Sequence, residues 1–157
     1  MLDGVSVEAT AEADVIECRT TATDRDAVLR ELSDWLIRGG YAAPGFGEAL
    51  RTREAEFPTG LEGDGGGVAV PHAEPGMVSR PAVILCRPEA PIPFRRMDAP
   101  DEEVGAELVL LLAIPDAKRH LDLLRTLSSV FSDAALFAEL RAGATLADLI
   151  RKGVVQA

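Results

Sequence analysis

The chain has 157 residues, the size of one ordinary globular domain, and 47% of them are hydrophobic, which is enough for a packed core. Its 26 acidic residues outnumber its 16 basic residues, which gives a net charge of −10. So large an acidic excess argues against nucleic acid or an anionic membrane surface as the main partner. A basic partner, or a small anion held in a locally positive pocket, stays open.

The chain carries no apolar run long enough to span a bilayer, the longest being residues 108–114. Its N-terminal residues include acids and lack the apolar stretch of a signal peptide. Cys18 and Cys86 form no CxxC motif, so they predict neither a disulfide framework nor a thiolate zinc site. We therefore expect a cytoplasmic protein without direct membrane insertion, in which both cysteines pack in the core.

The first half of the chain predicts a short strand and two helices. Residues 1–13 lack periodicity and bulky apolar groups, and they predict a mobile N-terminal lead-in. Residues 14–19 alternate in polarity as a short strand does. Capping residues and apolar spacing predict a helix over 24–38, and a second helix over 46–56 is ended by a proline. The glycine-rich stretch 59–67 predicts a turn or flexible loop.

The second half predicts the main strands of a sheet. Apolar, β-branched runs at 68–70, 82–85 and 107–114 read as strands, and the last is unbroken enough to be buried on both faces at the centre of the sheet. A proline-rich connection holds one edge strand near 93–96. Helices before, between and after the strands predict an α/β sandwich around one sheet, forming a single domain over 14–157. The remaining helices are predicted over 118–131, 133–141 and 145–151.

One histidine follows a predicted strand in the segment GGGVAVPHAEP, residues 65–75. Pro71 forces Val70 into an extended conformation and leaves His72 just past the strand end. A histidine with the ordinary pKa of about 6.5 is mostly neutral at pH 7, so one ring nitrogen can act as a nucleophile. If a backbone carbonyl takes the proton of the other nitrogen, the reactive one points outward. The plainer alternative is that His72 ends a strand and hydrogen-bonds a loop.

Two further side chains could hold an anion. His120 lies on the apolar face of the helix predicted over 118–131, in its first turn, where free backbone N–H groups favour an anion. Arg53 lies in TREAEFPTG, residues 52–60, and a guanidinium can donate two parallel hydrogen bonds to a phosphate. The alternatives are a partly buried histidine bonded to a carbonyl and a solvated arginine among acids. Two histidines without a metal-ligand motif make a poor metal site.

These segments carry a resemblance to a known family. It rests on TREAEFPTG at 52–60, GVAVPH at 67–72 and RHLDLLRTLSSVF at 119–131, and on the order of these motifs along the chain. Together they resemble the enzyme IIA component of the fructose/mannitol class (type 2) of the bacterial phosphoenolpyruvate-dependent sugar phosphotransferase system. The resemblance covers about residues 14–155. The FPTG stretch and the HAEP continuation after the histidine are most similar to galactitol-type members.

The resemblance implies a phosphotransferase with a mixed β-sheet and helices on both faces. The family phosphorylates the histidine that ends its motif, here His72, and has a second active-site histidine, here His120, and an arginine, here Arg53. Its phosphate arrives from the carrier protein HPr and leaves to a cysteine of an enzyme IIB component, here by analogy for a galactitol-like sugar or polyol. No cofactor is implied, because phosphoryl transfer needs mostly positioning and electrostatic stabilisation. We expect backbone N–H groups near Gly67 or at the start of helix 118–131 to add donors.

Other interpretations stay open at this point. A regulatory module similar to nitrogen-related enzyme IIA proteins would use the same phosphohistidine to control binding to a target protein, although the FPTG and HAEP stretches fit the sugar branch better. A metabolite-binding α/β domain without phosphotransfer is disfavoured by the presence of both histidines. Glu74 could activate water, but we interpret it as a solvated loop acid. Met77 and Val78 are candidates for a shallow docking face.

Overall fold

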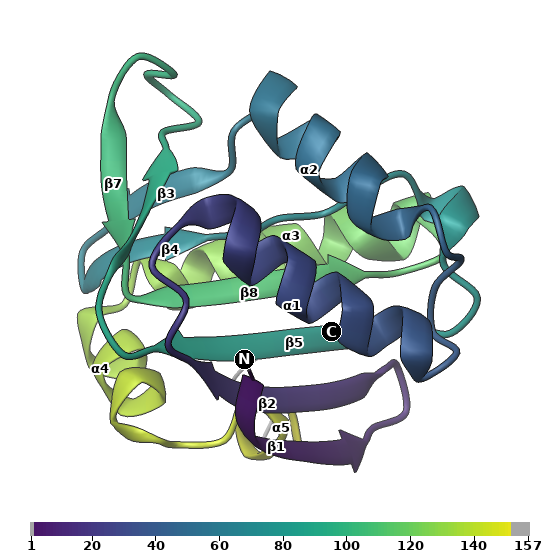
Figure 1. Cartoon of the computed structure of the whole chain (residues 1–157). Helices are drawn as coiled ribbons and strands as arrows, with labels where there is room; N and C mark the ends of the chain where they lie inside the picture. Colours follow the sequence, from purple (N-terminus) through teal and green to yellow (C-terminus); the bar gives the residue numbers. More distant parts are fainter. Residues whose placement is uncertain (1, 152–157) are drawn as a thin grey trace.

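Six strands form a mixed central sheet. They are β1 (Leu2–Ala9), β2 (Asp14–Thr20), β3 (Gly60–Gly63), β4 (Gly66–Ala69), β5 (Ala82–Pro88) and β8 (Leu108–Ala113). The computed structural model describes residues 2–151. The strands lie in the order β1-β2-β5-β8-β4-β3 (Figure 1), with β2 parallel to β5 and β4 parallel to β8, and the other neighbours antiparallel. The predicted central strand is confirmed, because β8 lies inside the sheet and is buried along its whole length.

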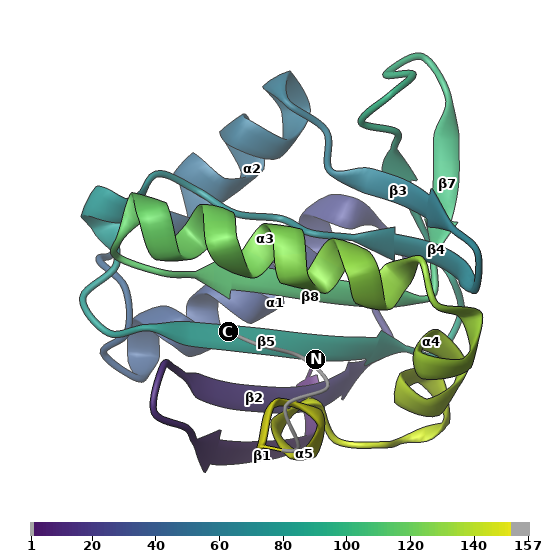
Figure 2. The same cartoon turned by 180° about the vertical axis from the view of Figure 1, so that it is seen from behind.

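Helices cover both faces of this sheet, as the fold prediction requires. On one face lie α1 (Arg25–Arg38) and α2 (Phe46–Glu56), which are in front in Figure 1. The opposite face, seen in Figure 2, carries α3 (Ala117–Phe131), α4 (Ala134–Ala142) and α5 (Leu146–Arg151). All five helices agree with the predicted ranges to within two residues, because caps and apolar spacing are local signals.

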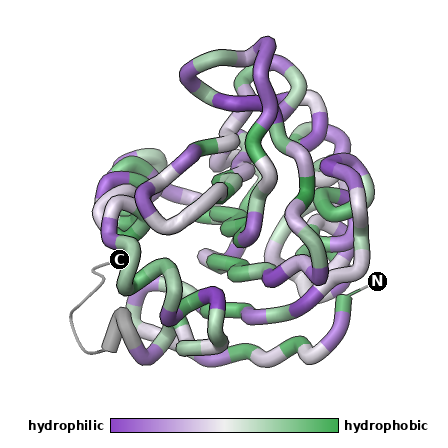
Figure 3. Tube along the Cα trace, turned by 90° about the vertical axis from the view of Figure 1, so that its left-hand side faces the viewer, coloured by the Kyte–Doolittle hydropathy of each residue, from purple (hydrophilic) through white to green (hydrophobic). Residues whose placement is uncertain are grey.

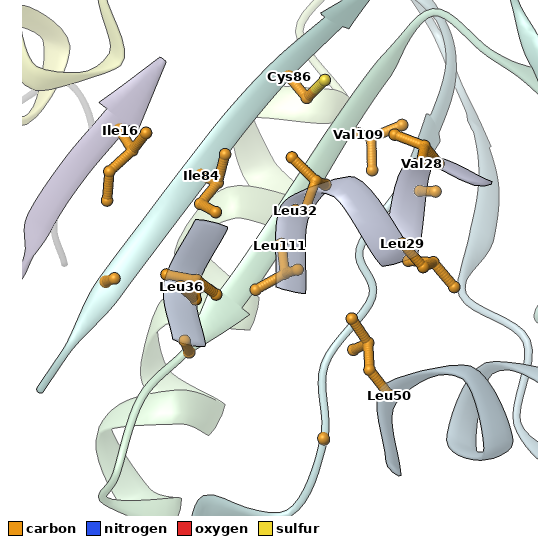
Figure 4. Close-up of a cluster of buried hydrophobic side chains, with 14 of the residues drawn as sticks. Ile16, Val28, Leu29, Leu32, Leu36, Leu50, Ile84, Cys86, Val109 and Leu111 are labelled. Carbon is orange, nitrogen blue, oxygen red and sulfur yellow. The ribbon is translucent and has the colours of Figure 1, made fainter. Parts of the chain in front are cut away.

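The alternation of side chains along the strands divides the core into two halves. Val109 and Leu111 of β8 face α1 and α2, whereas Leu110 faces α3. Cys18 and Cys86 are buried on the α1 side at paired positions of β2 and β5, as expected for packing residues. Figure 4 shows this half of the core, where α1 lays its apolar side chains onto the sheet. Figure 3 shows the hydrophobic segments mostly among the inner strands.

The prediction of a lead-in without regular structure is wrong for residues 2–9. These residues form β1, an edge strand that pairs antiparallel with β2. Val5, Val7 and Ala9 alternate with Ser6 and Glu8, a short strand pattern that the prediction overlooked, although most side chains of β1 are exposed. Pairing with β2 gives this strand its hydrogen bonds. Residue 1 of the predicted lead-in and residues 152–157 of the predicted domain lie outside the described residues.

The prediction of a turn or flexible loop over 59–67 is confirmed only for the turn at residues 64–65, because β3 and β4 form a hairpin on either side of it. Its glycines provide room for close packing. A Cβ atom on Gly67 would clash with the carbonyl oxygen of Gly105, and one on Gly63 with the carbonyl oxygen of Phe131. Composition does not distinguish a glycine that bends the chain from one that lets two backbones approach.

A small second sheet lies beside β3 and β4 and consists of β6 (Ile92–Arg95) and β7 (Glu103–Ala106). The edge strand predicted near 93–96 is thus present as β6, but it pairs with β7 and does not extend the main sheet. The loop between β6 and β7 projects from the body and is largely hydrophilic (Figure 3). No helix within residues 2–151 combines the length and the apolar character needed to cross a membrane.

Candidate functional site

His72 lies where the chain leaves the sheet at the end of β4. The carbonyl oxygen of Pro71 accepts a hydrogen bond of 3.1 Å from the N–H of Leu112, so one bridge still holds this segment against β8. His72 itself is half-buried. The site therefore sits at the rim of the sheet, between α2 on one face and α3 on the other (Figures 1 and 2).

A backbone carbonyl sets the tautomer of His72. Its Nδ1 atom lies 2.8 Å from the carbonyl oxygen of Val70. A carbonyl oxygen can only accept, so Nδ1 carries the proton of the neutral ring and Nε2 keeps its lone pair. Burial lowers the pKa of His72 below 6.5, the bond to Val70 partly offsets this effect, and the nearby Arg53 lowers the pKa further. At neutral pH the ring is uncharged and Nε2 is a nucleophile.

His120 meets His72 from the first turn of α3. The centroids of the two rings are 4.6 Å apart and their planes are inclined by 59°. Burial, followed by the proximity of His72 and of Arg53, lowers the pKa of His120 to about 4. Neutral imidazole offers one N–H donor. Within residues 2–148 neither ring nitrogen of His120 has a hydrogen-bond partner, so this donor is available to a ligand.

Arg53 reaches the same place from the last turn of α2. Its Nη1 donates to Oε1 of Glu74 at 2.6 Å, and its guanidinium carbon lies 5.0 Å from the centroid of the Phe57 ring. Nε is buried and has no hydrogen-bond partner. The Glu74 side chain is 74% exposed, so this ion pair is held loosely. Arg53 thus provides positive charge and unused donors beside two neutral histidines.

The three residues singled out from the sequence line one surface cleft of about 320 Å³. Glu74 and Leu121 also contribute to its wall. A neighbouring hollow of about 530 Å³, between α2 and the turn after Glu74, shares Arg53 with it. No group of three or more His, Cys, Asp and Glu side chains among the described residues is arranged to hold a metal ion. The cleft offers a nucleophile, a cation and a neutral N–H donor, the set that a transferring phosphoryl group requires.

The extra backbone donors expected near Gly67 are absent from the cleft, and those expected at the start of α3 are partly occupied. At the start of α3 the carboxylate of Asp116 already accepts the backbone N–H groups of Lys118 and Arg119, at 2.8 and 3.4 Å. These two donors are used for capping, as a helix N-terminus commonly requires. Gly67 packs against β7 and does not line the cleft. Ala117, the first residue of α3, does line the cleft.

The apolar surroundings of the cleft differ from those expected. Val78 is buried and Met77 half-buried, whereas Phe57 and Leu121 are 59% and 48% exposed. Both exposed residues belong to elements that carry a site residue, α3 in one case and the end of α2 in the other. A bulky apolar residue placed among acids, as Phe57 is, was the available sequence signal for this surface.

Comparison with known proteins gives evidence on the family of this chain that does not depend on the geometry of the cleft. The family model described as phosphoenolpyruvate-dependent sugar phosphotransferase system, EIIA 2, matches residues 10–152. The galactitol-specific EIIA component of Escherichia coli K12 is 34% identical over 104 residues, which are 66% of this chain and 69% of that protein.

Solved structures share the fold. The mannitol enzyme IIA of Escherichia coli, determined in complex with phosphorylated mannitol enzyme IIB, has a TM-score of 0.67 at 22% identity and covers 92% of this chain and 95% of its own. The nitrogen regulatory protein IIA-Ntr of Neisseria meningitidis has a TM-score of 0.64 at 23% identity, with coverages of 88% and 90%. Because the family model spans nearly the whole described chain, this protein belongs to the type 2 enzyme IIA family, the phosphotransferase components of the sugar phosphotransferase system.

Proposed function

We propose that this protein is a histidine phosphocarrier, which accepts a phosphoryl group from phospho-HPr on Nε2 of His72 and passes it to a cysteine of an enzyme IIB component. The observation that carries the proposal is the bond between Nδ1 of His72 and the Val70 carbonyl, 2.8 Å long, which leaves Nε2 unprotonated. The ring stands in a cleft with Arg53 and His120, where phosphoryl oxygens would find donors.

In the forward step the lone pair of Nε2 attacks phosphorus while the bond from phosphorus to the donor's nitrogen breaks. The donor imidazole leaves with that electron pair. Charge accumulates on the three equatorial oxygens, and Arg53 and the N–H of neutral His120 donate to them. In the second step a thiolate attacks phosphorus, and Nε2 recovers its lone pair. The proton on Nδ1 stays in place throughout, so His72 needs no proton transfer of its own.

The ion pair between Arg53 and Glu74 has to open when the phosphoryl group arrives. Glu74 is mostly exposed and gains solvation when it is displaced, so the cost of opening is small. A dianionic phosphoryl group then replaces the carboxylate of Glu74 as the partner of the Arg53 guanidinium. Glu74 thus acts as a mobile counter-ion of Arg53 in the unphosphorylated protein.

Two relatives support the choice of partners and substrate class. The galactitol-specific relative is 34% identical and favours uptake of a galactitol-like sugar or polyol. The mannitol enzyme IIA was solved with phosphorylated enzyme IIB, which supports an enzyme IIB as the acceptor here. Exposed Phe57 and Leu121 flank the cleft and provide apolar contact area for such a partner. A regulatory role like that of IIA-Ntr has the likeness of fold alone in its favour.

The test is phosphorylation with labelled phosphoenolpyruvate, enzyme I and HPr. We expect one acid-labile phosphate per chain, absent from His72→Gln and formed more slowly in His120→Gln. Label that persists in His72→Gln contradicts the site. The phosphorylated protein is then mixed with a galactitol-type enzyme IIB domain and with the same domain lacking its cysteine. Transfer to the first alone supports sugar transport, and failure of transfer contradicts it.

A further inference from the structure

A buried carboxylate lies next to Arg53 in the sequence but points away from the cleft. Glu54 is 1% exposed and accepts two hydrogen bonds from Thr59, one from its backbone N–H and one from its hydroxyl, both of 2.7 Å. Thr59 is itself 2% exposed. Burial raises the pKa of Glu54, and the two bonds from Thr59 lower it. Both carboxylate oxygens act as acceptors, so the hydroxyl proton of Thr59 is committed to Glu54.

The lone pairs of that hydroxyl face the strand that carries His72. The backbone N–H of Val70 donates to Oγ1 of Thr59 at 3.2 Å and to the carbonyl oxygen of Thr59 at 3.3 Å. The carbonyl oxygen of Val70 in turn accepts the Nδ1 proton of His72 at 2.8 Å. A continuous series of hydrogen bonds therefore runs from Glu54, through Thr59 and Val70, to the ring that would carry the phosphoryl group.

The position of Val70 explains why such an anchor is needed. The last residue of β4 is Ala69, and Pro71 has no N–H to donate. The N–H of Val70 is thus the last backbone donor before His72, and a hydrogen bond to it can hold the end of the strand in place. Because the bond from Nδ1 sets the tautomer of a histidine, the placement of the Val70 carbonyl decides which ring nitrogen is free.

We propose that Glu54 and Thr59 are positioning residues, which hold Val70 so that its carbonyl keeps the proton of His72 on Nδ1 and leaves Nε2 free. The inference rests on the proposed function of His72 as the phosphoryl acceptor. It also explains the motif TREAEFPTG: Pro58 ends α2 and returns Thr59 to the carboxylate of Glu54. One helix end thereby supplies both the cation of the cleft, Arg53, and the anchor of the nucleophile.

The test reads the tautomer directly. Labelling histidine with a nitrogen isotope gives spectra of only two rings, and His120→Gln assigns them. In long-range proton–nitrogen correlation spectra we expect wild-type His72 to show one tautomer, with Nε2 unprotonated. In Thr59→Val, which removes the hydroxyl and keeps the shape, we expect the tautomer ratio to shift about fivefold toward the Nε2–H form, the effect of losing one hydrogen bond.

Three variants separate positioning from stability. Thr59→Ser keeps the hydroxyl and should restore the wild-type tautomer. Glu54→Gln keeps one acceptor and should give an intermediate shift. Thr20→Val is the matched control, because buried Thr20 donates to Glu31 at 2.7 Å in the same kind of threonine–glutamate bond, on a strand without a site residue. It should lower stability as Thr59→Val does and leave the spectrum of His72 unchanged.

The transfer rate provides a second readout. We expect Thr59→Val to lower the kcat of phosphorylation about tenfold, with KM for phospho-HPr unchanged, because the lost interaction orients the ring and contacts no partner. An unchanged tautomer in folded Thr59→Val and Glu54→Gln overturns the inference, whatever the rate. If the tautomer shifts as expected but wild-type His72 accepts no phosphate, the positioning stands and the proposed function fails.

Discussion

Two arginines near opposite ends of β8 show how differently one side chain can be used. Arg87 lies in β5, one residue after Cys86, which pairs with Val109 near the start of β8. All three of its nitrogens donate: Nε to the carbonyl of Leu140 at 2.7 Å, Nη1 to Glu17 at 2.8 Å and Nη2 to the carbonyl of Ala144 at 2.8 Å. Its side chain is 17% exposed. Arg53, at the other end, has one exposed partner and a buried Nε without any.

The difference separates a structural cation from a binding one. Arg87 ties α4 and the segment before α5 to the sheet, and Glu17 completes the tie by accepting the N–H of Leu146 at 3.0 Å. Each of its three nitrogens donates a hydrogen bond within the protein, so its main role is structural. Nε of Arg53, in contrast, is buried without a hydrogen-bond partner. A buried polar atom without a partner destabilises a folded protein unless a ligand supplies one. This difference supports the proposed role of Arg53 in holding the phosphoryl group.

The largest expected effect is on stability, when Arg87 is replaced. Arg87→Met leaves Glu17 buried without its cation and should lower the free energy of unfolding by about 3 kcal/mol. The measurement is urea unfolding followed by circular dichroism. Arg141→Met is the control, because Arg141 forms an ion pair of the same length, 2.8 Å, with Glu107 but is more exposed, and its loss should cost below about 1 kcal/mol. Equal losses in the two variants would contradict the assignment of Arg87.

The next largest effect is on the rate of phosphotransfer, when Arg53 is replaced. Arg53→Met should slow single-turnover phosphorylation by phospho-HPr about 100-fold, because a donor to the transferring group is lost. Its stability should change by less than about 1 kcal/mol, since its ion pair with Glu74 is exposed. Arg51→Met, on the same helix but outside the cleft, is the control. Near-normal transfer by Arg53→Met would refute the role of this side chain.

A smaller effect is the acid sensitivity of the site. Both histidines have a pKa below 6.5 in the folded protein, that of His120 near 4. Below pH 6.5 the unfolded chain binds protons that the folded protein does not, so stability falls as the pH falls from 6.5 toward 4. His120→Gln should remove about 1 kcal/mol of this loss, a value reduced by solvent screening. Urea midpoints of both proteins at pH 7.5 and 4.5 test it, and parallel losses would exclude His120 as a source.

The smallest effect concerns the counter-ion. Glu74→Gln should release Arg53 and raise the phosphorylation rate about twofold to threefold, the worth of one exposed ion pair. Removing this carboxylate also lowers the pKa of His72, because the negative charge of Glu74 raises it. The measurement is the single-turnover rate at low salt and at high salt. The advantage of the variant should disappear at high salt, where exposed charges are screened; a slower variant would contradict the competition between Glu74 and phosphate.

The sequence predicted the helices and the central strands well, because their signals are local. A capping aspartate before α1, a left-handed glycine after α4 and an unbroken apolar run for β8 each act within a few residues. The strands of the β3–β4 hairpin were missed because their cause lies elsewhere in the chain, whereas the short alternation in β1 was overlooked. Glycine makes the hairpin fit against β7 and α3, and β2 gives β1 its hydrogen bonds.

The amino-acid sequence alone identifies which residue types can carry the chemistry: two histidines, one after a strand and a proline and one in the first turn of a helix, and an arginine near a helix end. Their protonation states and hydrogen-bond partners follow from the folded structure. The tautomer of His72 depends on Val70 and, through it, on Thr59, which lies just before β3, and the pKa of His120 depends on burial beside His72. Arg53 and Arg87 are the same type of residue, but the fold brings hydrogen-bond partners to all three nitrogens of Arg87 and leaves Nε of Arg53 without one. The burial of His120 and the partners of both arginines come from distant parts of the chain, and no local pattern encodes them.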